Sequence, residues 1–209
     1  MELIPEDRLN FYELATLSTS QGTSDAVAPA ILDYATRPEA QGKLRGLWRT
    51  CIGQLNQIVL LREFDSRPSL AAERERARRS SDPFNCCKHL TALDMTSFVP
   101  FDFFPSVEIG PRGPLYELRT YHLRPAGLSP LEARWRADAE TGAADGGTII
   151  AMYTMDGEPR LMEIRALGDF NSKVADNATY PVTIPGSDDW LMPETTSSLL
   201  VPLPSSPLH

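Results

Sequence analysis

The feature that most constrains this chain of 209 residues is an internal repeat. The segment FYEL at residues 11–14 corresponds to LYEL at 115–118, an offset of 104. NQIVLLREF from Asn56 corresponds to PRLMEIRAL from Pro159 at an offset of 103, and TSFVP from Thr96 to SLLVP from Ser198 at 102. Three landmarks in one order at a nearly constant offset indicate a duplicated unit. We therefore expect two units, residues 1–104 and 105–209.

Hydrophobic periodicity predicts the same order of elements in both units. In the first, strands are expected at 11–17, 47–53, 56–64 and 93–99, with helices at 24–37 and 65–80. In the second, strands are expected at 115–123, 148–155, 160–167 and 198–202, with helices at 129–140 and 169–178. The dipeptide Asp156-Gly157 is a hairpin signal. This βαββαβ order predicts an α+β fold of tandem ferredoxin-like units.

Three segments resemble the NIPSNAP family of the dimeric α+β barrel superfamily. They are YELRTYHLRPAG at 116–127, GQLNQIVLLREFDS at 53–66 and LPSSP at 203–207. The resemblance implies that the two units pack sheet to sheet as a pseudo-dimer, with helices outside and a cavity between the sheets. The family's third strand commonly reads V-V-H-x-W. Here Leu60 and Glu163 stand at the His position, and Arg62 and Arg165 stand at the Trp position, so no role of that His is carried over.

Composition narrows the class of protein. Hydrophobic and charged contents of 42% and 23% are ordinary for a globular chain. The net charge of −8 divides into −2 for residues 1–104 and −6 for the remainder, which argues against nucleic-acid binding. The longest apolar run is far shorter than a membrane span, and the N-terminus lacks the pattern of a signal peptide. We expect a cytoplasmic protein that does not bind membranes and whose three cysteines are reduced.

Strand alternation separates the faces of the strands in the second unit. We expect the apolar faces to meet the helices, which would turn a charged face toward the inter-sheet cavity. That face carries Glu117, Arg119, Tyr121, Glu163 and Arg165, and the first unit repeats it only in Glu13 and Arg62.

Two interpretations of this face remain open. The charges could pair completely and stabilise the barrel, because buried charges are costly unless paired. Alternatively they line a pocket, with Arg119 and Glu163 as the catalytic pair and the other five residues binding the ligand.

The function predicted from these features is binding of a small organic molecule, anionic or carbonyl-containing, with cofactor-independent acid/base catalysis as the associated chemistry. No cofactor and no metal are expected, since Cys86, Cys87 and His89 lack a fourth ligand. One alternative is a protein-interaction module using the aromatic stretch FVPFDFFPSV at 98–107, which could equally pack between the units. Another, implied by the superfamily, is haem-dependent chemistry. A homo-oligomer built on the pseudo-dimer is compatible with all three.

Overall fold

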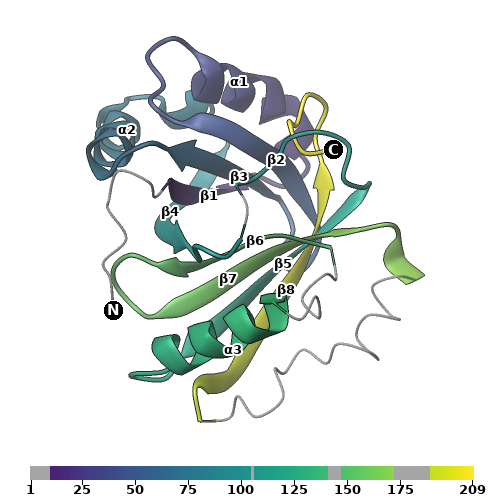
Figure 1. Cartoon of the computed structure of the whole chain (residues 1–209). Coiled ribbons are helices and arrows are strands. Elements are labelled where there is room, and N and C mark those ends of the chain that lie inside the picture. Colours follow the sequence, from purple (N-terminus) through teal and green to yellow (C-terminus); the bar gives the residue numbers. More distant parts are fainter. Residues whose placement is uncertain (1–9, 105, 141–146, 172–188) are drawn as a thin grey trace.

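The computed structural model describes residues 10–104, 106–140, 147–171 and 189–209 (Figure 1). The first half contains β1 (Phe11–Thr19), α1 (Ser24–Thr36), β2 (Lys43–Ile52), β3 (Gln57–Phe64), α2 (Arg67–Arg79) and β4 (Leu90–Pro100). The second contains β5 (Leu115–Leu123), α3 (Leu128–Glu140), β6 (Thr148–Thr154), β7 (Arg160–Leu167) and β8 (Leu191–Pro202). The predicted strands and the first three helices are confirmed. The helix predicted at 169–178 lies mostly outside the described residues.

The eight strands form one closed barrel in the order β1-β3-β2-β8-β5-β7-β6-β4. Each half contributes four antiparallel strands, with its first and third strands in the centre, which is the ferredoxin-like order. Two short seams join the halves. In one seam Trp48 of β2 is paired with Pro202 of β8, and in the other Phe98 of β4 is paired with Thr154 of β6. The fold is therefore a tandem ferredoxin-like barrel, as the repeat predicted, while the boundary at residues 104 and 105 stays a prediction.

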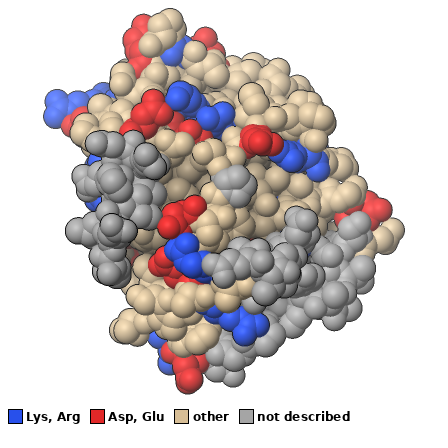
Figure 2. Space-filling view, in the orientation of Figure 1, with Lys and Arg blue, Asp and Glu red and all other residues tan. Residues whose placement is uncertain are grey.

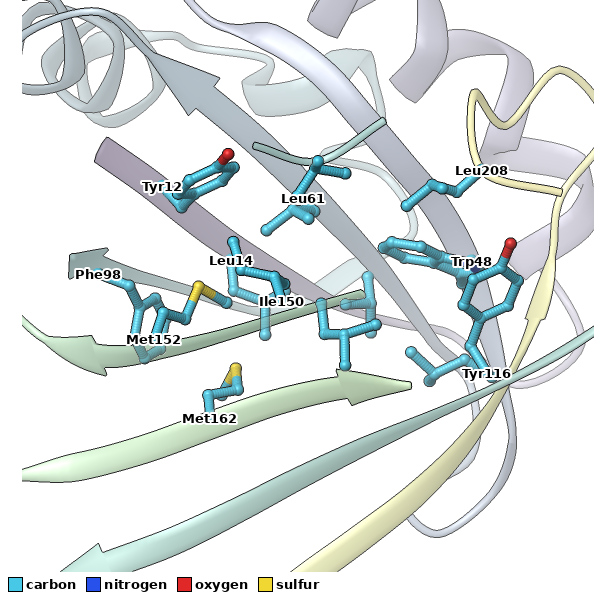
Figure 3. Packing of buried hydrophobic residues seen from close by; sticks show 14 residues of the cluster. Tyr12, Leu14, Trp48, Leu61, Phe98, Tyr116, Ile150, Met152, Met162 and Leu208 are labelled. Atoms are coloured by element: carbon cyan, nitrogen blue, oxygen red, sulfur yellow. The ribbon is translucent and has the colours of Figure 1, made fainter. Parts of the chain in front are cut away.

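The interior of the barrel is apolar and filled by side chains, as is usual for eight strands. Figure 3 shows this cluster between the strands of the two halves. Every strand contributes to it, and so do the linker and the C-terminal segment: Tyr12, Leu14, Trp48, Val59, Leu61, Phe98, Val107, Tyr116, Ile150, Met152, Met162, Ile164, Leu200 and Leu208. Further apolar clusters pack α1 and α2 against the first half and α3 against the second.

This arrangement corrects the predicted direction of the charged faces. Tyr116 of β5 and Met162 and Ile164 of β7, expected under the helices, lie inside the barrel. Glu117 and Arg165 therefore point to the outer, helix-covered side. The physical reason is that the helix side of the first half supplies a partner for a buried charge, since Glu73 on α2 meets Arg62 there. The one carboxylate on the interior face of β3, Glu63, has its own partners in Arg45 and Tyr12.

The C-terminal segment closes one end of the barrel. Leu203 N–H donates to Leu47 O at 3.0 Å, and Leu47 N–H donates to the Ser206 hydroxyl at 2.9 Å. Leu208 is fully buried in the barrel cluster, and Arg112 N–H donates to His209 O at 2.7 Å. The end of the chain thus ties the linker between the halves to the barrel.

The aromatic stretch at 98–107 packs within the molecule. Phe98 and Val107 are part of the barrel interior, and Phe101 stacks on Phe103 with ring centroids 5.3 Å apart. Phe101 and Phe104 also contact Trp135 of α3. Packing, rather than an exposed apolar patch, is the arrangement found for this stretch.

Candidate functional site

A buried ion-pair network lies between the sheet and α2 in the first half. Cross-strand pairing sets Glu13 of β1 directly opposite Arg62 of β3. All three guanidinium nitrogens of Arg62 donate: Nε and Nη2 to Glu13 Oε1, and Nη1 to Glu73 Oε1. Arg76 Nη2 lies 2.6 Å from the same Glu73 oxygen, and Gln41 N–H donates to the other at 3.2 Å.

The environment of Glu73 stabilises its charged form. Burial alone would raise the pKa of this carboxyl, but the hydrogen bonds from Arg76 and the charge of Arg62 outweigh that and leave the pKa lowered. The side chains of Glu13, Arg62 and Glu73 are all fully buried. These contacts hold β1 and β3 to α2, and the ligand-binding role of Glu13 and Arg62 stays a prediction.

The second half repeats this pair and adds another. Glu117 is opposite Arg165 in the β5–β7 register, as Glu13 is opposite Arg62, and Arg119 is opposite Glu163. The first half has Ala15 opposite Leu60 at the latter positions. The outer face of β5 and β7 therefore holds two carboxylates and two guanidiniums where the first half holds one of each. We call Glu117, Arg119, Tyr121, Glu163 and Arg165 the β5–β7 cluster.

Hydroxyl groups from the neighbouring strands orient both carboxylates of this cluster. Ser197 of β8 donates to Glu117 Oε1 at 2.6 Å, and Thr148 of β6 donates to Glu163 Oε1 at 2.7 Å. Arg119 Nε lies 2.8 Å from Glu117 Oε1, whereas Arg165 Nε is 3.6 Å from Glu163 Oε1. Sequence reasoning missed Ser197 and Thr148, although the register of β6 and β8 next to the predicted charges could have indicated them.

Burial and charge perturb the titration of the cluster. Burial acts to lower the pKa of Arg119, but Glu117 and the contact with Tyr121 outweigh it and raise the pKa. The pKa of Tyr121 is raised to about 12, first by burial and then by the carboxylate of Glu163, with Arg119 opposing. At neutral pH the cluster therefore contains guanidinium groups and a protonated phenol, which are hydrogen-bond donors.

One nitrogen of Arg119 has neither a hydrogen bond nor an ion-pair contact within the described part of the chain. Arg119 Nη2 is buried, and no described residue accepts a hydrogen bond from it. Since nearly all buried polar groups in proteins are paired, such an atom needs an explanation. Glu163 is the most accessible of the four charged residues, with 11% of its side chain exposed against 4% for Arg119 and none for Glu117. Access to the cluster is thus greatest at the Arg119–Glu163 pair.

A pocket of about 390 Å³ opens on the same outer side of the second half. It lies between the turn joining β5 to α3 and the hairpin joining β6 to β7, next to Leu123 and Tyr153. Leu123 is two residues beyond Tyr121 on β5, so the pocket and the cluster occupy different stretches of one face.

The other candidates from the sequence do not assemble into a site. His122 Nδ1 lies 3.1 Å from Glu158 Oε1 at the end of β5. Cys86 is buried, and burial raises the pKa of its thiol to about 11, which keeps it protonated and unreactive. Within the described ranges, no three His, Cys, Asp or Glu side chains are grouped so as to hold a metal ion.

Charges on the molecular surface are mixed in sign. On the face shown in Figure 2, basic and acidic side chains lie beside one another. Elsewhere in the described chain, Arg136 pairs with Asp102 at 2.6 Å. No helix in the described part of the chain is long and apolar enough to cross a membrane.

Solved structures share this fold over nearly the whole chain. A protein of Fusobacterium nucleatum assigned as a monooxygenase covers 93% of this chain and 93% of its own, with 13% identity and a TM-score of 0.64. An anthrone oxidase-like protein covers 95% and 93%, with 10% identity and a TM-score of 0.65. Chlorite dismutases match over a similar extent. At these identities the similarity defines the class of fold, the dimeric α+β barrel, and nothing finer.

The resemblance to NIPSNAP proteins is confirmed only in part. A NIPSNAP domain protein from Burkholderia xenovorans is 24% identical, but covers 46% of this chain and 99% of its own, with a TM-score of 0.34. Such a match spans one unit and is too weak to carry an argument about function. No protein-family model matches the sequence, and no curated protein does.

Proposed function

We propose that the second half of the barrel binds a compact organic molecule with an anionic or carbonyl oxygen at the β5–β7 cluster. The observation that carries this proposal is the buried Arg119 Nη2, which no described residue accepts. An oxygen of the ligand would accept from this nitrogen in a desolvated position, where a charge-assisted hydrogen bond is strong. The first half has no counterpart of this donor, because Ala15 stands at the position of Arg119 and every nitrogen of Arg62 already has an acceptor.

The same geometry supports acid/base chemistry as the reaction class. Glu163 is cross-strand from Arg119, is the most accessible carboxylate of the cluster, and is oriented by Thr148. A carboxylate held in this way can take a proton from a carbon next to a carbonyl whose oxygen is bound by Arg119. Glu117 and Arg165 orient the pair, and the protonated Tyr121 supplies a further donor. The site would then work without a redox cofactor, on a substrate of the keto-acid or enolisable carbonyl type.

The test is a titration of the full chain with pyruvate, a compact molecule that carries both a carboxylate and a carbonyl. We expect saturable binding by calorimetry that weakens at least tenfold in Arg119→Gln, the loss of one charge-assisted hydrogen bond. Glu163→Gln should keep binding within a few-fold but abolish exchange of the methyl protons of pyruvate with deuterated water.

The matched control is Leu60→Met in the first half, at the position equivalent to Glu163, which should bind as the unmodified chain does. If Arg119→Gln binds pyruvate unchanged, the cluster is structural only. Proton exchange that survives in Glu163→Gln would remove the acid/base assignment while leaving the binding assignment intact.

A further inference from the structure

The pocket beside the β6–β7 hairpin lies where the equivalent turn and hairpin of the first half are joined by hydrogen bonds. The turns after β1 and β5 have the same backbone pattern. Thr23 N–H donates to Ser20 O as Gly127 N–H donates to Arg124 O, and Thr19 N–H donates to Asn56 O as Leu123 N–H donates to Pro159 O. Gly22 and Ala126, equivalent at the repeat offset of 104, both have positive φ, 73° and 64°.

In the first half, polar side chains close the space between turn and hairpin. Asn56 is the central residue: its Oδ1 accepts from Gly22 N–H at 3.2 Å, and its backbone oxygen accepts from the Thr19 hydroxyl at 3.1 Å. The Thr19 and Ser24 hydroxyls also lie 3.0 Å apart. The hairpin is thereby bonded directly to the turn.

In the second half, each of these polar residues is replaced by an apolar one. Leu123 stands for Thr19, Leu128 for Ser24 and Pro159 for Asn56. None of these side chains can form the bridging hydrogen bonds, and all three line the pocket of about 390 Å³. The N–H of Ala126, equivalent to the bonded N–H of Gly22, has no acceptor among the described residues. The second half thus has a mainly apolar, open pocket in place of these hydrogen bonds, and the N–H of the exposed Ala126 at its edge is available to a ligand.

We propose that this pocket is a second binding site, for a small, neutral, mainly apolar carbonyl compound whose oxygen accepts from Ala126 N–H. The volume is within the range of small-molecule sites. The walls formed by Leu123, Leu128 and Tyr153 suit a ring or a branched chain. A neutral ligand is favoured because the lining carries one charge of each sign, Arg124 and Asp156, and its other side chains are mainly apolar. This inference does not depend on the β5–β7 cluster.

The test uses phenylacetone, a neutral ketone with one aromatic ring, titrated into the uniformly ¹⁵N-labelled full chain and followed by ¹H–¹⁵N NMR. We expect a saturable downfield shift of the Ala126 amide, with smaller shifts at Leu128 and Gly157. Ethylbenzene, which has the ring but no acceptor, should leave the Ala126 amide in place. Leu128→Ser, which restores the first-half residue, should weaken phenylacetone binding about tenfold.

Met155→Trp fills the pocket from its half-buried rim and should abolish the shift. Leu55→Trp is the matched control, because it adds the same ring to the exposed hairpin of the first half and should leave binding unchanged. The inference is overturned if phenylacetone shifts amides elsewhere and not Ala126, or if Met155→Trp binds it as tightly as the unmodified chain. Spectra of both tryptophan variants report directly whether the fold is kept.

Discussion

Replacing each of two equivalent tyrosines by phenylalanine tests how the barrel interior handles buried hydroxyls. Tyr12 and Tyr116 are related by the repeat offset of 104, are 1% and 0% exposed, and both belong to the apolar cluster inside the barrel. Their hydroxyls differ in one respect. Tyr12 donates to Glu63 Oε2 at 3.0 Å, whereas no described residue pairs with the Tyr116 hydroxyl.

The two substitutions should therefore change stability in opposite directions. Tyr12→Phe removes a hydrogen bond to a charged acceptor, and we expect it to lower the free energy of unfolding by about 2 kcal/mol. Tyr116→Phe removes a hydroxyl that was desolvated without a partner, and we expect a gain of about 1 kcal/mol. For a chain of this size the melting temperatures should then differ by roughly 6–12 °C.

Urea unfolding at pH 7, followed by far-UV circular dichroism, measures both variants against the unmodified chain. The dependence of the free energy of unfolding on urea concentration should be the same in all three proteins, so the shift of the urea midpoint alone reports the change in stability. Equal losses in the two variants would refute the reasoning, because they would show that the hydroxyls have equivalent partners. A loss confined to Tyr116→Phe would reverse the assignment of which tyrosine is paired.

The remaining predictions concern pH, close packing and the ion-pair network. Burial raises the pKa of Tyr116 and Tyr121 to about 12, so these phenols ionise first in the unfolded chain, and the free energy of unfolding should fall as pH rises from about 10 toward 12. In Tyr116→Phe the urea midpoint should fall less steeply with pH. A pH dependence of the midpoint equal to that of the unmodified chain would exclude Tyr116 as a contributor. Gly46→Ala would place Cβ 1.8 Å from Trp48 Cη2 and should lower the free energy of unfolding, measured by thermal unfolding, by more than about 3 kcal/mol. Gly22→Ala, where nothing lies within 4 Å of the added Cβ, should lower it by only about 1 kcal/mol. Similar losses in both variants would contradict the packing of Trp48 on Gly46. Arg62→Met leaves Glu13 without its cation and should cost about 3–5 kcal/mol, with part of the loss recovered by adding Glu13→Gln; a cost below about 1 kcal/mol would mean that the network is not buried as described. Folding lowers the pKa of the Glu73 carboxyl, so its charged form stabilises the fold at pH values above the pKa that Glu73 has in the unfolded chain. This stabilisation is lost as pH falls through the lowered pKa. Glu73→Gln should therefore reduce the loss of stability on acidification, measured between pH 5 and 3.

The repeat allowed the fold to be predicted from the sequence, because three landmarks at a nearly constant offset fixed both the number of units and the order of their elements. The direction of the charged faces could not be predicted in the same way. β3 is buried on both sides, with all of Ile58–Phe64 inaccessible, so alternation distinguishes its two faces without indicating which one meets the helices. The deciding residue was Glu73, a charged residue of the predicted helix at 65–80, which the structure buries against Arg62.

The pocket beside the β6–β7 hairpin could in principle have been predicted from the sequence. Aligning the two copies places Pro159 opposite Asn56 and Leu128 opposite Ser24, which are changes from hydrogen-bonding to apolar residues at loop positions. Their meaning depended on knowing that Asn56 bonds across to Gly22, a contact between segments 34 residues apart. The sequence correctly predicted that the charged residues of the β5–β7 cluster lie next to one another, because the β5–β7 register sets Arg119 opposite Glu163. It did not predict on which side of the sheet they lie.

The covalent joining of the two halves has a consequence for how such a barrel can diversify. In a barrel assembled from two identical chains, every substitution occurs twice, and a change that weakens one side weakens both. Here one half bonds every nitrogen of Arg62 and joins its turn to its hairpin through Asn56. The other half has Arg119 Nη2 without an acceptor among the described residues, and Pro159 stands where Asn56 stood. A single polypeptide can thus hold two differently substituted halves in the same barrel, a freedom that a symmetric pair of chains does not have.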